Sequence, residues 1–125
     1  MKNPRILATA AAAALATLAL LSTGTTAHAT VKDYPSSTAT RNPTVSGTTA
    51  HLWAKVDSSH KASYAYVSSG SRAVQARAQC QRRNGGTAWY QSTIRVHAGG
   101  GNSHYDCDNN GTYNTAIVGL GVDIN

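Results

Sequence analysis

Beyond residue 47, apolar and polar residues alternate along the chain, which is the pattern of β-strands that bury one face. The alternation predicts about six strands, at residues 50–56, 62–68, 72–83, 87–98, 103–107 and 112–124. Turns rich in Gly and Asn separate them, and both residue types tolerate positive φ. No segment beyond residue 29 keeps a 3.6-residue apolar period. The chain is therefore predicted to be all-β, and the strand spacing is typical of a small antiparallel β-sandwich, with a small barrel as the alternative.

The same alternation assigns the faces of the strands that should be buried. In the strand at 72–83 the inward residues are expected to be Val74, Ala76, Ala78 and Cys80. In the last strand they are expected to be Ala116, Val118, Leu120, Val122 and Ile124.

Residues 1–29 have the order of a secretory signal peptide. Lys2 and Arg5 precede an apolar stretch at 6–21, and the segment ends on the small-x-small sequence Ala27-His28-Ala29. The apolar stretch is mostly alanine and contains two threonines, whereas a retained membrane span needs about 20 solidly apolar residues. We therefore expect cleavage after Ala29 and a secreted, extracellular product without a transmembrane segment.

The remaining 96 residues are predicted to form one domain with an arm. Residues 30–47 are rich in Ser, Thr and Pro and are expected to be flexible, with an edge strand as an option near Thr44. Residues 48–125 are expected to form the sandwich. A domain of this size is only marginally stable on its core alone. The only two cysteines, Cys80 and Cys107, are predicted to stabilise it by forming a disulfide in an oxidising compartment.

Two resemblances bear on the fold. Gly111 and Tyr113 resemble the start of a late strand in immunoglobulin-like sandwiches, so an immunoglobulin-like topology is favoured, although Thr115 stands where an immunoglobulin has cysteine. The segment from Arg72 to the C-terminus is similar to the small, uncharacterised secreted proteins of actinobacteria, which share the alanine-rich signal and the Val-x-Ala-x-Ala-x-Cys strand. That likeness implies no activity.

One segment resembles the opening of a calcium loop. Asp106, Asp108 and Asn110 alternate before Gly111, so their oxygens are candidate ligands for a hard cation. The position where a calcium loop carries its bidentate Glu is Ile117, and the alternative interpretation is a turn composed of turn-forming residues.

A second candidate site is a basic sheet face. Arg77 and Arg83 share one side of a strand, and Arg95 and Trp89 lie on its hairpin partner, so together they are a possible surface for polyanions or glycans. The alternative is a solvated face whose charges prevent edge aggregation. Five aromatic residues are candidates for stacking on sugars, with packing in the core as the alternative: Trp53, Tyr64, Tyr66, Trp89 and Tyr90.

Composition argues against an enzyme. The chain has no Glu, only five Asp and no Gly-x-Ser-x-Gly motif, so neither paired carboxylates nor a serine triad is indicated. Removing Lys2 and Arg5 leaves nine Lys and Arg against five Asp, a net charge of +4. We expect a non-enzymatic binding or structural module without cofactors, whose partner is a cell-wall polymer, a glycan or another extracellular protein. The alternative is a secreted antagonist: a bacteriocin-like toxin or a small enzyme inhibitor.

Overall fold

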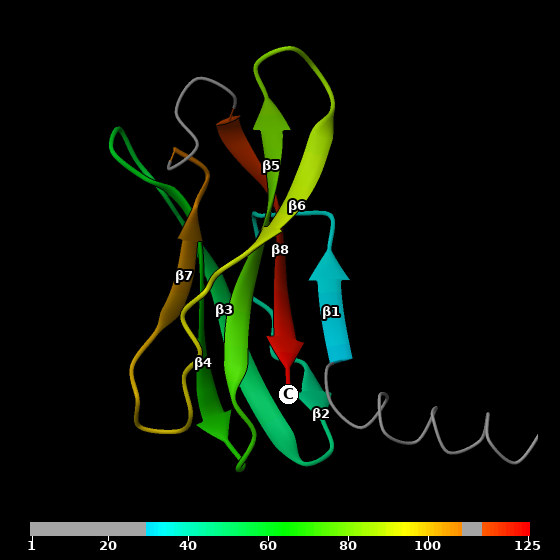
Figure 1. Ribbon diagram of the computed structural model, residues 1–125, viewed down its shortest axis with the longest axis vertical. Helices are drawn as coiled ribbons and strands as arrows, with labels where there is room; N and C mark the ends of the chain where they lie inside the picture. The colour runs from blue at the N-terminus through cyan, green and yellow to red at the C-terminus, as the bar shows by residue number, and fades with distance from the viewer. Residues whose placement is uncertain (1–29, 109–113) are drawn as a thin grey trace, which may run out of the picture.

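The computed structural model describes residues 30–108 and 114–125, which form two four-stranded antiparallel sheets packed as a sandwich (Figure 1). The first sheet has the order β1 (Thr30–Tyr34), β8 (Asn114–Ile124), β5 (Val74–Arg82), β6 (Thr87–Gln91). The second has the order β2 (Thr44–Val45), β3 (Thr48–Val56), β4 (Lys61–Ser69), β7 (Ser103–Asp106). The predicted all-β sandwich is confirmed.

The strand order places the last strand inside its sheet. β8 lies between β1 and β5, whereas the last strand of an immunoglobulin domain lies at an edge. β8 is an inner strand because β1 pairs with its outer side and takes the edge position. Gly111 and Tyr113, the residues that resemble the immunoglobulin strand start, lie outside the described residues.

The core between the sheets is built from small aliphatic side chains. Leu52, Leu120 and Ile124 are its largest fully buried members, and alanines from three strands fill the space around them. In the described part of the chain, every Trp and Tyr side chain is at least partly exposed. The aromatic side chains therefore lie at the sides of the sandwich and on its outer faces.

Aromatic contacts span both open sides of the sandwich. On one side Tyr90 of β6 stacks on Tyr105 of β7, with ring centroids 5.3 Å apart and planes inclined by 2°. Burial, together with Tyr90 and Asp106 nearby, raises the pKa of Tyr105. On the other side the guanidinium of Arg41 lies 4.9 Å from the centre of the Tyr34 ring. The three tyrosines pack against the core and shield it where the sheets end.

The N-terminal arm differs from the expected flexible segment. Residues 30–34 form β1, whose backbone pairs with β8 from Thr30 opposite Ile124 to Tyr34 opposite Leu120. The sequence pattern did not predict this strand, because it contains polar residues such as Lys32 and Asp33. An edge strand is held by backbone hydrogen bonds and needs little apolar content. The option of a strand near Thr44 is realised as β2, which pairs with the start of β3.

Two further differences from the expected pattern have local causes. A register shift pairs Gln79 with Gly119 but Cys80 with Ile117, so Val118 is passed over and Ile117 takes the inward position expected for Ala116 and Val118.

The strand expected at 87–98 ends as β6 at Gln91. Beyond that point the Ser103 hydroxyl accepts the hydrogen bond of the Ala76 amide and donates to the Ile94 carbonyl.

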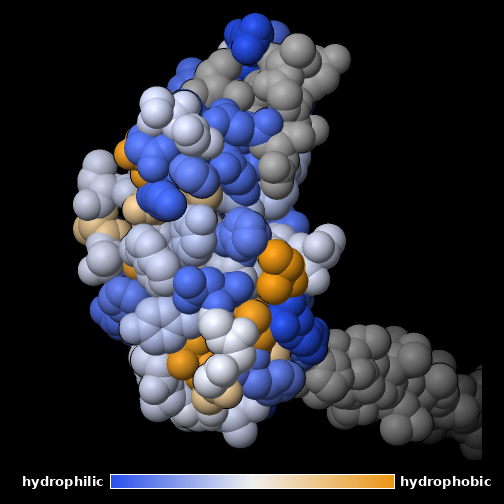
Figure 2. Space-filling view, turned by 90° about the vertical axis from the view of Figure 1, so that its left-hand side faces the viewer, coloured by the Kyte–Doolittle hydropathy of each residue, from blue (hydrophilic) through white to orange (hydrophobic). Residues whose placement is uncertain are grey.

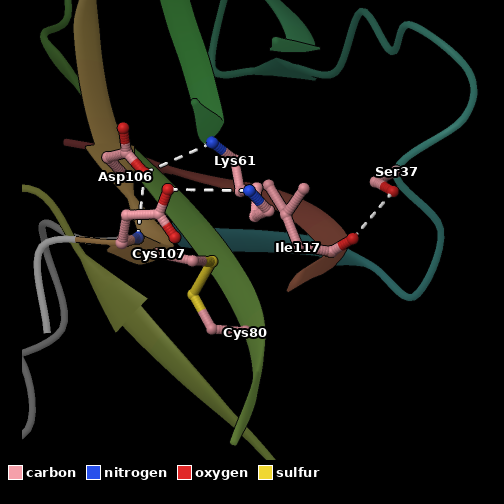
Figure 3. The surroundings of a disulfide bond; sticks show 7 residues. Ser37, Lys61, Cys80, Asp106, Cys107 and Ile117 are labelled. Atoms are coloured by element: carbon pink, nitrogen blue, oxygen red, sulfur yellow. Dashed lines mark hydrogen bonds and ion pairs between the residues drawn. A yellow bond between two sulfur atoms is a disulfide. The ribbon is translucent and has the colours of Figure 1, made fainter. Parts of the chain in front are cut away.

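The predicted disulfide is present and ties the two sheets together. Cys80 lies on β5 of the first sheet and Cys107 directly follows β7 of the second, and both are fully buried (Figure 3). Beside the bridge, the Asp106 carboxylate accepts hydrogen bonds from the backbone amides of Lys61 and Asp108 (Figure 3). The bridge therefore sits in a corner where β4, β5 and β7 are held together.

A cluster of polar side chains covers the outer face of the first sheet. We call Asp33, Arg77, Trp89, Gln91 and Asp123 the Arg77 cluster. Arg77 donates twice to the Asp33 carboxylate, at 2.9 Å each, and once to Gln91, which donates to Asp123. The guanidinium also lies 5.5 Å from the centre of the Trp89 ring. These contacts join all four strands of the sheet.

The Arg77 cluster depends on a glycine in β8. A Cβ atom added at Gly121 would collide with the Asp33 carboxylate and come within 3.1 Å of the Trp89 ring. The missing side chain therefore makes the room in which Asp33 reaches Arg77 across the sheet.

Removal of the disulfide is expected to destabilise the domain by about 3–4 kcal/mol, because the bridge closes a loop of about 28 residues in the unfolded chain. The measurement is urea unfolding of the variant Cys80→Ala/Cys107→Ala against the oxidised protein. Reductant should weaken the parent protein and leave the variant unchanged. A loss below about 1 kcal/mol would contradict the assigned role.

The substitution Gly121→Ala is expected to cost about 1–3 kcal/mol of stability through overpacking against Asp33 and Trp89. The same substitution in an Asp33→Ala background should cost less, because the nearest obstructing group has been removed. Equal costs in both backgrounds, measured by urea unfolding, would show that the two residues do not interact.

Candidate functional site

The outer face of the second sheet carries a cluster of five aromatic rings, which we call the aromatic strip. Its members come from three adjacent strands: His51 and Trp53 from β3, Tyr64 and Tyr66 from β4, and His104 from β7. Because side chains alternate across a strand, these residues face away from the core while their neighbours Leu52, Ala65 and Ser103 are buried.

Three of the rings form a row across the strands. The register pairs Trp53 with Tyr64 and Tyr64 with His104. The ring centroids are 5.3 Å apart at each step, and the planes are inclined by only 20° and 19°. Trp53, Tyr64 and His104 are therefore a continuous stack that crosses β3, β4 and β7.

The rings of the row overlap only in part. Aromatic carbons touch at about 3.5–4.0 Å, so parallel rings with centroids 5.3 Å apart are displaced sideways. Each ring consequently leaves part of its face open. All three side chains are half-buried and are therefore partly in contact with solvent.

The other two rings support the row from one side. His51 lies opposite Tyr66, with centroids 5.3 Å apart, and both rings contact Trp53 at 5.6 and 5.7 Å. Their planes are inclined to each other and to Trp53 by 36–66°. A hydrogen bond of 2.7 Å joins the His51 Nδ1 atom to the Asn42 side chain and helps to fix the ring.

Charged groups near the strip are largely paired with one another. Asp57 accepts hydrogen bonds from the Ser59 and His60 amides and from the His60 ring, and these contacts lower its pKa. Lys61 lies 3.7 Å from Asp108. Lys55 remains as an exposed cation on the same face, two residues beyond Trp53 along β3.

The structure brings together two members of the basic face predicted from the sequence. Arg77 and Trp89 do share the outer face of the first sheet, but they belong to the Arg77 cluster, where the guanidinium is bound to Asp33 and Gln91. Arg83 lies beyond β5 in the hairpin turn, and Arg95 lies beyond the end of β6. Both are exposed, and the basic face stays a prediction.

The residues of the predicted calcium loop are only partly described. Asp106 accepts backbone hydrogen bonds and Asp108 lies near Lys61, while Asn110 is outside the described residues. Among residues 30–108 and 114–125, no group of three or more His, Cys, Asp or Glu side chains is arranged to hold a metal ion. The calcium site stays a prediction.

Sequence reasoning identified part of the aromatic strip and missed the rest. Trp53, Tyr64 and Tyr66 were among the residues expected to stack on sugars or to fill the core, and the structure places all three outside the core. His51 and His104 were not recognised as ring partners. Their outward positions in the alternating pattern were readable, but the register that brings His104 beside Tyr64 was not.

A hydropathy scale does not reveal a site made of Trp, Tyr and His. The side of the molecule that carries β7 is coloured mostly as polar, with apolar residues in small separate patches (Figure 2). Trp, Tyr and His have low hydropathy in spite of their flat apolar ring faces, so a strip made of these residues does not stand out as a hydrophobic patch.

In the described part of the chain, no helix is long and apolar enough to cross a membrane. Comparison of the chain with protein-family models, with curated proteins and with solved structures finds no match.

Proposed function

We propose that this protein is a secreted, non-enzymatic module that binds an extracellular or cell-wall polysaccharide through the aromatic strip. The observation that carries the proposal is the placement of the rings. A chain without Phe builds its core from Ala, Val, Leu and Ile and holds five rings of the strip on the outside.

The chemistry of the strip suits carbohydrate. The face of a sugar ring presents C–H groups, which carry a small positive charge, and the face of an aromatic ring is negative, so the two stack. Trp and Tyr also present an N–H or O–H group that pairs with sugar hydroxyls. Because the rings already hold each other in place, few side-chain rotamers are lost when a ligand binds.

Export is consistent with this function. The signal-like segment at 1–29 would release a chain that begins at β1, and the disulfide fits an oxidising compartment. A target outside the cell is therefore the natural partner for the strip.

The competing role for the strip is purely structural. Aromatic pairs across strands stabilise sheets by about 0.2–1 kcal/mol each even when nothing binds to them. The two roles differ in what a substitution changes: a structural strip affects unfolding alone, whereas a binding strip also affects retention on polysaccharide.

The substitution Trp53→Ala is expected to abolish retention of the secreted protein on purified cell wall, chitin or cellulose, because it removes the ring that contacts Tyr64, His51 and Tyr66. The measurement is a pull-down with the folded variant, and folding is checked by its unfolding midpoint. Trp89→Ala is the matched control, since it removes the other Trp from the opposite face and should leave retention unchanged. Failure of the parent protein to bind any of the three polymers would contradict the proposal.

A further inference from the structure

We infer that the ligand is an internal segment of a neutral, linear polysaccharide that lies across the strands, along the row Trp53, Tyr64 and His104. This inference rests on the proposed function and adds the direction, the charge and the mode of binding of the chain.

The direction follows from the ring planes. Along the row, successive planes are inclined by 20° or less, so a chain of sugar rings meets similar surfaces at each step. Along β3 the surface changes from the tilted His51 ring to Trp53 and then to the flexible Lys55 side chain. The path across the strands is therefore the one that offers repeated stacking.

The row runs from β3 to one edge of the second sheet. β7, which carries His104, is an edge strand of that sheet. Beyond Trp53 the chain nearest to β3 is the segment at Arg41, which forms a single bridge to Leu52 and is preceded by the small, exposed residues Ala39 and Thr40. An edge strand at one end and small exposed residues at the other suit a long polymer that passes over the strip, so its chain ends are not required.

The surroundings favour an uncharged ligand. The carboxylate of Asp57 and the cation of Lys61 have partners within the protein, and Lys55 lies to one side of the row. An acidic polymer would meet one exposed Lys beside the row, Lys55, because the cation of Lys61 is already paired with Asp108. Contacts with a neutral polymer depend on ring faces and are insensitive to salt.

The inference is tested by native affinity electrophoresis in gels that contain hydroxyethyl cellulose, glycol chitin freed of charged units, or polygalacturonate. We expect retardation by at least one of the two neutral polymers, with a change of less than about twofold in 0.5 M salt. Trp53→Ala should weaken binding about tenfold, and His104→Ala several-fold, since each substitution removes one ring of the row. Lys55→Ala, the control along the strand, should change binding by less than about twofold.

Other outcomes overturn the inference without touching the proposed function. A large effect of Lys55→Ala with none of His104→Ala would mean that the chain runs along β3. Stronger, salt-sensitive binding to polygalacturonate would mean that the ligand is acidic. If the polymer retards the parent protein and all of the strip variants equally, the proposed site itself is wrong.

Binding to internal segments has its own readout. Partial depolymerisation of the neutral polymer at constant mass multiplies the chain ends. A protein that binds internal segments should show unchanged affinity per sugar until the fragments become shorter than the row. Affinity that rises with the number of ends would overturn this part of the inference.

Discussion

Burial of small aliphatic side chains between two sheets is the constraint from which the rest of this structure follows. Alanines supply much of the interior, and the largest fully buried residues are Leu52, Leu120 and Ile124. Each of these residues buries little apolar area, and burial stabilises the fold by only about 25 cal/mol per Å². A domain of this length is therefore marginally stable on its core alone. Stability must therefore come from additional devices, and these devices occupy the sides and faces of the sandwich.

Each device is visible as a specific contact. The disulfide between Cys80 and Cys107 links the two sheets directly, and the stacked pair Tyr90 and Tyr105 closes one side. On the first sheet, the bidentate bond between Arg77 and Asp33 holds the N-terminal strand against the other three. The outer faces of the two sheets therefore differ. On the first sheet, Asp33, Arg77 and Gln91 bond to one another, whereas the rings on the second sheet are partly exposed.

The alternating pattern was sufficient to predict the fold class and the central strands, because burial of one face is a property of each strand by itself. The disulfide was predicted separately, from two cysteines in a small chain with an export signal. It was insufficient wherever pairing between strands decides the outcome. β1 is held by the backbone of β8, a partner about 90 residues away in the sequence, and its own residues carry no apolar pattern. The passed-over Val118 likewise reflects the register between β5 and β8, which one strand read alone does not contain.

The same reasoning explains why the candidate site was only half predicted. Individual rings such as Trp53 and Tyr64 can be recognised as stacking residues from their type, but the proposed binding surface depends on the register that aligns them with His104. Conversely, Arg77 and Trp89 looked available in the sequence because a strand pattern shows which side a residue faces and not which partner it finds there. In a sheet protein with a small core, the outward positions of neighbouring strands should therefore be read together as rows. Such a row can pair most of its polar groups internally, as the Arg77 cluster does, or it can keep partly exposed rings, as the aromatic strip does.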